Sequence, residues 1–189
     1  MSETGTETEL EASELESDLE DLGSSVADQV ESFLLAVRAI AGSGDAARAV
    51  PLLLLEVSQL LLAGGRLGVQ TDFVPSEQYE PDPGPDPDLD EVRAALAQLL
   101  GHADDYIEVF DPYDRRPELV PSRISDDICA IAGRVAHGLQ HHRAGRVDEA
   151  LWWWQFSYVS SWGAEASSVL RALQSVIAHD RLDEERELS

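Results

Sequence analysis

The amino-acid sequence predicts an all-α protein, a single-domain bundle of about five helices with a long central C-terminal helix. Apolar residues recur at alternating steps of three and four over several long segments, which is the spacing of one helix face. A chain of 189 residues with 43% hydrophobic content is also enough for one domain with a full core. The longest periodic segment, residues 147–179, has two adjacent apolar stripes, so we expect neighbours on more than one side of it. One stripe comprises Trp152, Phe156, Val159, Gly163, Ala166, Leu170, Leu173 and Ile177, and the other Val147, Leu151, Trp154, Tyr158 and Trp162.

Both chain ends are charged and flank a helical domain expected over residues 23–182. Residues 1–22 contain many acids, no basic residue and only scattered leucines, so we expect a disordered acidic tail. Residues 183–189 are expected to fray. The first firm helix should follow a cap at Ser24 or Ser25. Its inner face would hold Val26, Val30, Phe33, Val37 and Ile40, and Gly42 and Gly44 would end it.

The second helix is expected over residues 45–63, with Pro51 as a kink or a restart and the glycine pair 64–65 as its end. Leucines lie nearly all round it, which indicates a buried helix. Glu56 in its middle therefore needs a partner, because an unpaired buried carboxylate is costly. Polar residues interrupt the apolar run 52–62, and the run is too short to span a bilayer.

Two irregular segments separate the later helices. Residues 72–88 alternate prolines with acids, which blocks both helix and sheet, so we expect an extended loop. A third helix should start near Asp88, and we allow it to continue through Gly101 to Phe110. Residues 111–121 form a second expected loop. The fourth helix then has Ile124, Ile128, Ile131, Val135 and Leu139 on its inner face.

The net charge of −24, with arginine as the only cation besides histidine, argues against nucleic acid or an anionic membrane as a direct partner. It permits a protein partner, including a basic one, and a homo-oligomer stays open. The single cysteine, Cys129, cannot form an intramolecular disulfide, and we expect it buried in a reducing cytoplasm. The N-terminus shows no secretion signal, so we expect a cytoplasmic protein.

A histidine pair offers the clearest metal-ligand spacing. His137 and His141 are four residues apart and share a helix face, with Asp126 and Asp127 earlier on the same helix. The HExxH form is absent, and a third ligand would have to come from another helix. Only His137 lies close to the apolar face. We therefore interpret the histidines as surface or satisfied side chains, and we expect no metal, no cofactor and no catalytic residue.

The remaining candidate binding residues are a glutamate, two arginines and two tryptophans. Arg171 lies among small residues that would let a helix or a ligand approach, and we expect it to pair with Glu56. Arg66 belongs to the glycine-rich segment 64–68, which follows a helix rather than a strand and is interpreted as a helix end. Trp153 points away from both stripes, as an interface anchor or as a side chain packed under the loop 111–121. Trp162 belongs to a stripe.

The sequence resembles the DUF5063 domain family of bacterial proteins. The resemblance is carried by I-S-D-D-I at 124–128, G-R-x-x-E-A-L-W at 145–152, Phe156, Trp162-Gly163 and the run L-R-A-L at 170–173. The runs P-L-L-L-L-E-V at 51–57 and L-L-L-A-G-G-R-L-G at 60–68 look like the actinobacterial branch. The resemblance covers about residues 26–182. It implies a helical domain in a bacterial cytoplasm and supplies no activity, cofactor or catalytic residue.

Two functions follow as expectations. The first is a non-enzymatic interaction or regulatory module with an acidic surface, because we recognise no catalytic constellation. The alternative is a helical bundle that binds a small ligand or a metal, with enzymatic activity as an option. In that case Glu56, His137, Trp162 and Arg171 would line one polar pocket.

Overall fold

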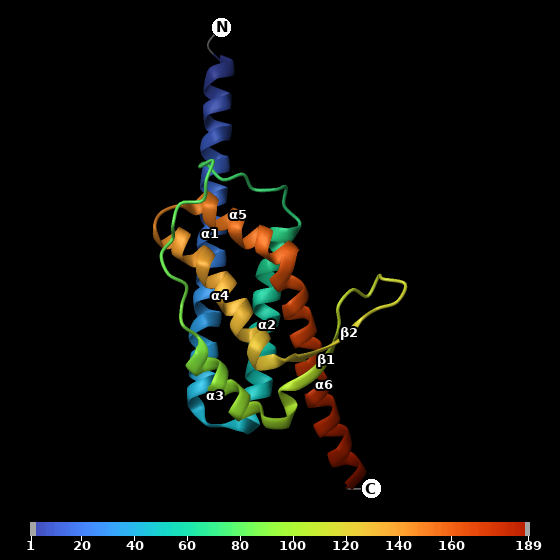
Figure 1. Ribbon diagram of the computed structural model, residues 1–189. Coiled ribbons are helices and arrows are strands. Elements are labelled where there is room, and N and C mark those ends of the chain that lie inside the picture. The colour runs from blue at the N-terminus through green and yellow to red at the C-terminus, as the bar shows by residue number, and fades with distance from the viewer. Residues whose placement is uncertain (1–2, 188–189) are drawn as a thin grey trace.

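The structure is a computed structural model that describes the backbone of residues 3–187 and the side chains of residues 17–181. It confirms a mostly α-helical bundle of five helices with a long C-terminal helix and a small two-stranded sheet (Figure 1). The first four helices are α1 (Glu3–Ser43), α2 (Ala46–Gly68), α3 (Asp90–Leu100) and α4 (Ile124–Arg143). The last consists of α5 (Val147–Ser157), a π-helical turn η2 (Tyr158–Trp162) and α6 (Gly163–Glu187).

The core lies where the inner faces of these helices meet. The faces expected for the first and fourth helices are confirmed, because every residue named for them is buried. Cys129 is also buried, and burial raises the pKa of its thiol to about 11, so the thiol is unreactive at neutral pH.

The first helix begins much earlier than its expected cap. The backbone of residues 3–22 is helical where a disordered tail was expected, and Ser24 and Ser25 lie inside α1. Leucine, alanine and glutamate are good helix formers, and no proline interrupts this segment. The C-terminal residues expected to fray continue α6 as far as Glu187. Side chains before residue 17 and after residue 181, and the backbone of residues 1–2 and 188–189, lie outside the described part.

The second helix continues past the glycine pair that was expected to end it. A Cβ atom at Gly64 would lie 2.4 Å from Cη2 of Trp162 and 2.5 Å from Cδ2 of Tyr158. Gly64 is therefore the place where the aromatic rings of η2 reach the α2 backbone. By length and composition α2 could also cross a membrane, contrary to the expectation from the shorter run 52–62. It nevertheless packs against α1 and α6 and buries Leu53, Val57, Leu60 and Leu67, as a core helix does.

The π-turn η2 changes which face of the C-terminal helix is buried. Before it, Leu151 and Trp154 are buried and Phe156 is exposed, and Val159 within it is exposed as well. After it, Ala166, Val169 and Leu173 are buried. A π-turn adds a residue to one helical turn, so the buried face moves to the next position in the sequence. The first predicted stripe is therefore wrong at Phe156 and Val159 and right at Ala166 and Leu173.

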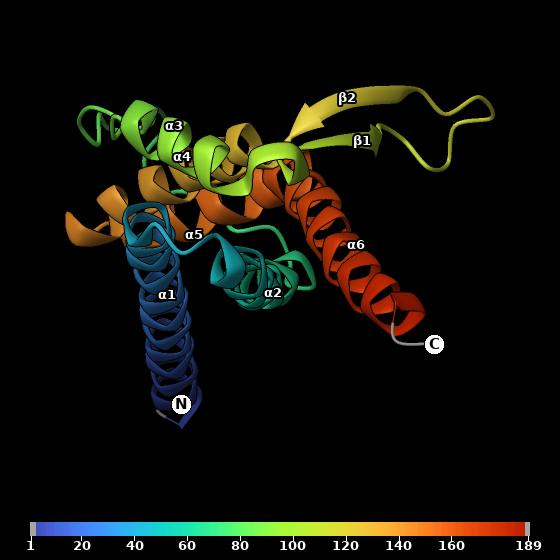
Figure 2. The same cartoon turned by 90° about the horizontal axis from the view of Figure 1, so that it is seen from below.

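A β-hairpin occupies the segment expected to hold the end of the third helix and the second loop. Gly101, with φ of 56°, ends α3, and a 3₁₀ turn η1 (Gly101–Ala103) follows. Strands β1 (Asp105–Val109) and β2 (Leu119–Arg123) pair antiparallel, with Ile107 opposite Pro121. The aromatic and β-branched residues of this segment favour strands, which explains why it forms a hairpin instead of a helix end and a loop. The hairpin projects from the bundle beside α6 (Figures 1 and 2).

The connection between α2 and α3 runs over the outside of the bundle (Figure 1). Residues 72–88, rich in proline and aspartate, contain neither helix nor strand. Five residues attach this connection to α4 and α5. The backbone N–H groups of Phe73 and Ser76 donate to Gln155 and Asp148. Glu80 bonds to two histidines, Asp86 bonds to one of them, and the carbonyl of Pro85 accepts from Gln140.

Candidate functional site

A groove of about 690 Å³ lies between the β-hairpin and α6. One wall is formed by Ile107, Val109 and Phe110 of the hairpin. The floor consists of small residues of α6, including Ala164, Ser167 and Ser168, with Arg171 among them and His179 near the end. Figure 2 shows the hairpin and α6 diverging from a common base. We name this feature the hairpin groove.

The base of the hairpin is fixed to the bundle by two side chains of β1. The hydroxyl of Tyr106 donates to Asp127 Oδ2 on α4 at 2.8 Å. Glu108 Oε1 accepts a hydrogen bond of 3.0 Å from Ser168 Oγ on α6. Since both acceptors are carboxylates, these bonds are charge-assisted when the acids are ionised. The groove therefore has a fixed floor and a fixed inner end.

This arrangement alters the pKa values of both Asp127 and Tyr106. Burial raises the pKa of its carboxyl to about 6, although the hydrogen bond from Tyr106 works in the opposite direction. Nearby Glu108 and Glu165 add to the rise through their charges. Burial, together with the bond to Asp127, also raises the pKa of Tyr106. Tyr106 thus stays a hydrogen-bond donor throughout the range in which Asp127 titrates.

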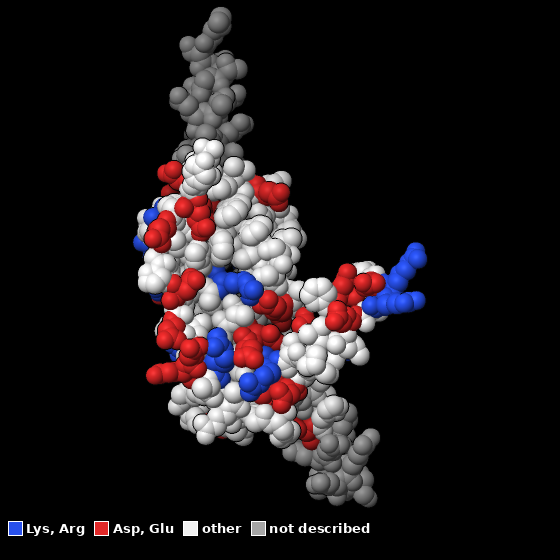
Figure 3. All heavy atoms as spheres, viewed as in Figure 1, with Lys and Arg blue, Asp and Glu red and all other residues white. Residues whose placement is uncertain are grey.

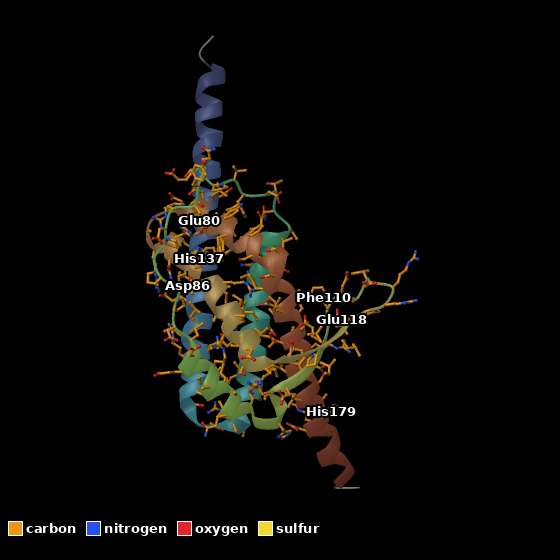
Figure 4. The ribbon with its side chains drawn as sticks, viewed as in Figure 1. Glu80, Asp86, Phe110, Glu118, His137 and His179 are labelled. Atoms are coloured by element: carbon orange, nitrogen blue, oxygen red, sulfur yellow. The ribbon has the colours of Figure 1, made fainter. Side chains whose placement is uncertain are left out.

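The outer part of the hairpin exposes large apolar side chains. Phe110 is 73% exposed and Tyr113 is 96% exposed, and Ile107, Val109 and Leu119 are also exposed. The sheet of the hairpin has two strands in the part of the chain that the structure describes. Phe110 on the hairpin and His179 on α6, both labelled in Figure 4, line the groove.

The expected pair of Glu56 and Arg171 does not form. Arg171 is exposed on the face of α6 that forms the groove floor, whereas the core face of α6 holds Ala166, Val169 and Leu173. No ion pair joins Glu56 to Arg171 among the described side chains. Burial raises the pKa of Glu56, and its Oε2 atom is buried without a partner.

The two candidate tryptophans have different surroundings from those expected. Trp153, on α5, packs against α4 rather than under residues 111–121, and its Nε1 donates to the carbonyl of Arg134 at 2.9 Å. Trp162 is buried against Tyr158, with ring centroids 4.8 Å apart. Its Nε1 is buried without a partner. Arg66 is exposed near the end of α2.

The histidines lie at the crossing of the α2–α3 connection over α4 (Figure 4). His137 Nε2 is 2.6 Å from Glu80 Oε1, and its Nδ1 is 3.2 Å from Asp86 Oδ1. His141, expected near the surface, is fully buried, and its Nε2 is 3.0 Å from the same Glu80 oxygen. Burial alone would raise the pKa of Glu80, but the hydrogen bonds from both histidines outweigh it and lower that pKa.

The candidate residues therefore do not line one pocket. No hydrogen bond, ion pair or aromatic contact among the described side chains joins any two of Glu56, His137, Trp162 and Arg171, and of these only Arg171 lines the hairpin groove. Asp126 and Asp127, in the first turn of α4, contact Arg93 and Tyr106 rather than the histidines. Glu80, which the sequence analysis missed, does contact them. The sequence shows only that Glu80 belongs to an acid-rich loop, and it does not show that this loop crosses over α4.

Comparison with known proteins identifies the fold. The family described as "Domain of unknown function (DUF5063)" matches residues 17–179. The crystal structure of protein BF1032 from Bacteroides fragilis is similar, with a TM-score of 0.63 and 19% sequence identity over 80% of this chain and 89% of that chain. At that identity the similarity concerns the fold alone. No curated protein matches the chain.

Proposed function

Since the chain belongs to the DUF5063 family, we propose for it a function based on its own surface, that of a non-enzymatic interaction or regulatory module. The hairpin groove is the proposed docking site. Its occupant would be a partner protein that places apolar side chains between the hairpin and α6 and has a basic surface around that contact. We place this interaction in the bacterial cytoplasm.

The exposed apolar side of the hairpin is the observation that supports this proposal. Soluble proteins seldom expose contiguous apolar residues unless something binds there. Here Ile107, Val109 and Phe110 lie together beside a groove with a volume in the range of small-molecule and peptide sites. The floor is lined by small residues, which lets a partner's backbone or a bulky side chain come close.

The charge of the chain supports a basic partner. The net charge of −24 creates a long-range field that attracts cations and speeds their encounter. Acidic side chains are spread over the face seen in Figure 3. Basic side chains lie among them on the bundle and also at the tip of the hairpin, where the sequence has Arg115 and Arg116. The partner would therefore meet acids over the bundle and apolar residues in the groove.

Affinity capture followed by direct binding tests this function. The protein would be used as bait at low salt in three forms, namely wild type, the double variant Ile107→Ser/Phe110→Ser, and the control Leu62→Ser. Leu62 is 63% exposed on α2 and lies outside the groove lining, so its change removes a similar apolar group elsewhere. We expect wild type and control to retain one partner, which then binds directly when both proteins are purified.

The double variant should bind this purified partner at least about tenfold more weakly, since each exposed apolar side chain lost from an interface costs about 1 kcal/mol or more. Equal binding by the double variant would contradict the groove as the docking site. Absence of any partner at low salt would contradict the interaction function itself. Concentration-dependent self-association that is lost in the double variant would make a second copy the occupant.

A further inference from the structure

Three metal-ligating side chains from two distant segments meet outside the hairpin groove. His137 and His141 lie one turn apart on α4, and Glu80 belongs to the connection that crosses them (Figure 4). One ligand atom from each lies within 4.8 Å of the other two. We propose that Glu80, His137 and His141 bind one divalent transition-metal ion, and we name these three residues the crossing site.

The distances need only a small adjustment to hold an ion. The Glu80 oxygen is 2.6 Å from His137 Nε2 and 3.0 Å from His141 Nε2. A tetrahedral zinc with bonds of about 2.0–2.1 Å keeps its ligand atoms about 3.3 Å apart. Glu80 would therefore retreat by less than about 1 Å, which an exposed loop residue can do. Its exposed side leaves a further coordination position for water.

Asp86 supports the role of His137 as a ligand. Its carboxylate lies 3.2 Å from Nδ1 of His137, so it accepts a hydrogen bond from Nδ1–H and leaves Nε2 free to bind the ion. Metal-binding histidines commonly have such a carboxylate on their second nitrogen, where it fixes the tautomer. The indole of Trp153 packs on the imidazole with ring centroids 4.2 Å apart, and this contact fixes the ring orientation.

Arg146 competes with the ion at His141. Its Nε donates to Nδ1 of His141 at 3.3 Å, which places the imidazole proton on Nε2, facing Glu80. An ion at Nε2 requires the proton to be on Nδ1, so Arg146 must turn away. A glutamine at position 146 would instead offer an oxygen to the Nδ1 proton and would remove a nearby positive charge.

The donor set defines the class of ion. Two imidazoles and one carboxylate suit zinc, iron(II), manganese(II) or cobalt(II). Calcium and magnesium prefer sites made entirely of oxygen ligands. The bound ion would attach the α2–α3 connection to α4. A metal ion bound by His137 and His141 departs from the expectation that these histidines are surface side chains or are satisfied within the protein.

Zinc titration of the untagged, metal-stripped full chain tests the crossing site. Calorimetry of wild type, Glu80→Gln, His137→Gln and the control Glu77→Gln would give stoichiometry and affinity. Glu77 is exposed in the same loop and contacts neither histidine, so its change removes the same charge without a ligand. We expect one zinc per chain, a loss of affinity of about 100-fold in the first two variants, and no change in Glu77→Gln.

Two further variants separate a metal site from a structural cluster of hydrogen bonds. Asp86→Asn should weaken zinc binding by about 10-fold, and Arg146→Gln should strengthen it by a similar factor. Circular dichroism of each metal-free variant would confirm that the fold is intact. The proposal would be overturned if wild type bound none of zinc, cobalt(II), manganese(II) and iron(II). It would also be overturned if Glu80→Gln and His137→Gln bound zinc as tightly as wild type. Binding of magnesium as tightly as zinc would overturn the assigned class of ion.

Discussion

Gly138 and Trp154 are in direct contact, and the indole fills the space that a side chain at position 138 would need. A Cβ atom at Gly138 would lie 2.3 Å from Nε1 of Trp154. The same Nε1 donates to the carbonyl of Val135 at 2.9 Å, so the ring cannot move without losing a buried hydrogen bond. This contact brings α4 and α5 close together.

Gly138→Ala should therefore destabilise the protein although alanine is the better helix former. Overpacking in a core costs about 1–3 kcal/mol, and the gain in helix propensity of about 1 kcal/mol offsets part of it. We expect a net loss of up to about 2 kcal/mol in the free energy of unfolding in urea. Gly133→Ala on the same helix has nothing within 4 Å and should stabilise by about 0.5–1 kcal/mol. Equal effects of the two variants would contradict this packing.

The neighbouring glycines of α2 allow the same comparison at the contact with η2. Gly64→Ala would drive a methyl group into Trp162 and Tyr158, whereas a Cβ at Gly65 meets nothing within 4 Å. We expect Gly64→Ala to lower the thermal midpoint of unfolding and Gly65→Ala to raise it. If position 65 proved the more sensitive one, the glycine pair would be a helix end, as the sequence suggested, and not a contact.

Asp127 should make stability depend on pH in a defined window. Its pKa is about 6 in the folded protein, against an ordinary value of 3.8. Because the pKa of Asp127 is higher in the folded than in the unfolded chain, the protonated carboxyl contributes to the stability of the fold. This contribution is fully present below about pH 4 and is lost as pH rises through about 6. Asp127→Asn cannot ionise. The stability of this variant relative to wild type should therefore increase by about 1–2 kcal/mol between pH 4 and pH 7. The difference is no larger because water still reaches part of the carboxylate in the wild type.

Urea unfolding of both proteins at several pH values measures this difference directly. Carboxyl carbon resonances provide an independent check, because Asp127 should titrate near pH 6. Tyr106→Phe removes the hydrogen bond that lowers this pKa and should move the midpoint upward. A pH-independent difference between wild type and Asp127→Asn would refute the prediction.

Asp104 caps α4 from outside the helix. Its side chain is buried, with Oδ1 accepting from the backbone N–H of Ser125 at 2.7 Å and Oδ2 from Ser125 Oγ at 2.8 Å. Asp104→Ala should cost about 2–4 kcal/mol, because a cap is lost and buried donors are left without a partner. Asp105→Ala, next to it but exposed, should cost less than about 1 kcal/mol. Similar losses in chemical denaturation would exclude the capping role.

Periodicity predicted those parts of the fold in which one helix face stays buried throughout. The inner faces of α1 and α4 are examples, because no turn within them changes the phase of the buried face. It failed at Phe156, just before the π-turn η2, and at Val159, within it, since this turn moves the buried face by one position and has no clear composition signal. The hairpin was also missed, because strand-forming residues such as Tyr106 and Ile107 directly follow a helical pattern.

The candidate sites were harder to predict than the fold. His137 and His141 were recognisable from their spacing, but Glu80 is distant in sequence and reaches them only because the connection crosses α4. Arg171 was assigned a partner on α2, whereas its position on α6 faces the hairpin. Such contacts depend on how elements pack, which the pattern of a single segment does not contain.

The path of the α2–α3 connection has a consequence for the order of folding. Its hydrogen-bonding partners on α4 and α5 lie 51 to 82 residues further along the chain. Closing loops of that length costs entropy before any contact repays it, so contacts with large sequence separation slow folding. The connection can attach only after α4 and α5 have formed and packed. It should therefore acquire protection from hydrogen exchange last during refolding, after the helices that it crosses.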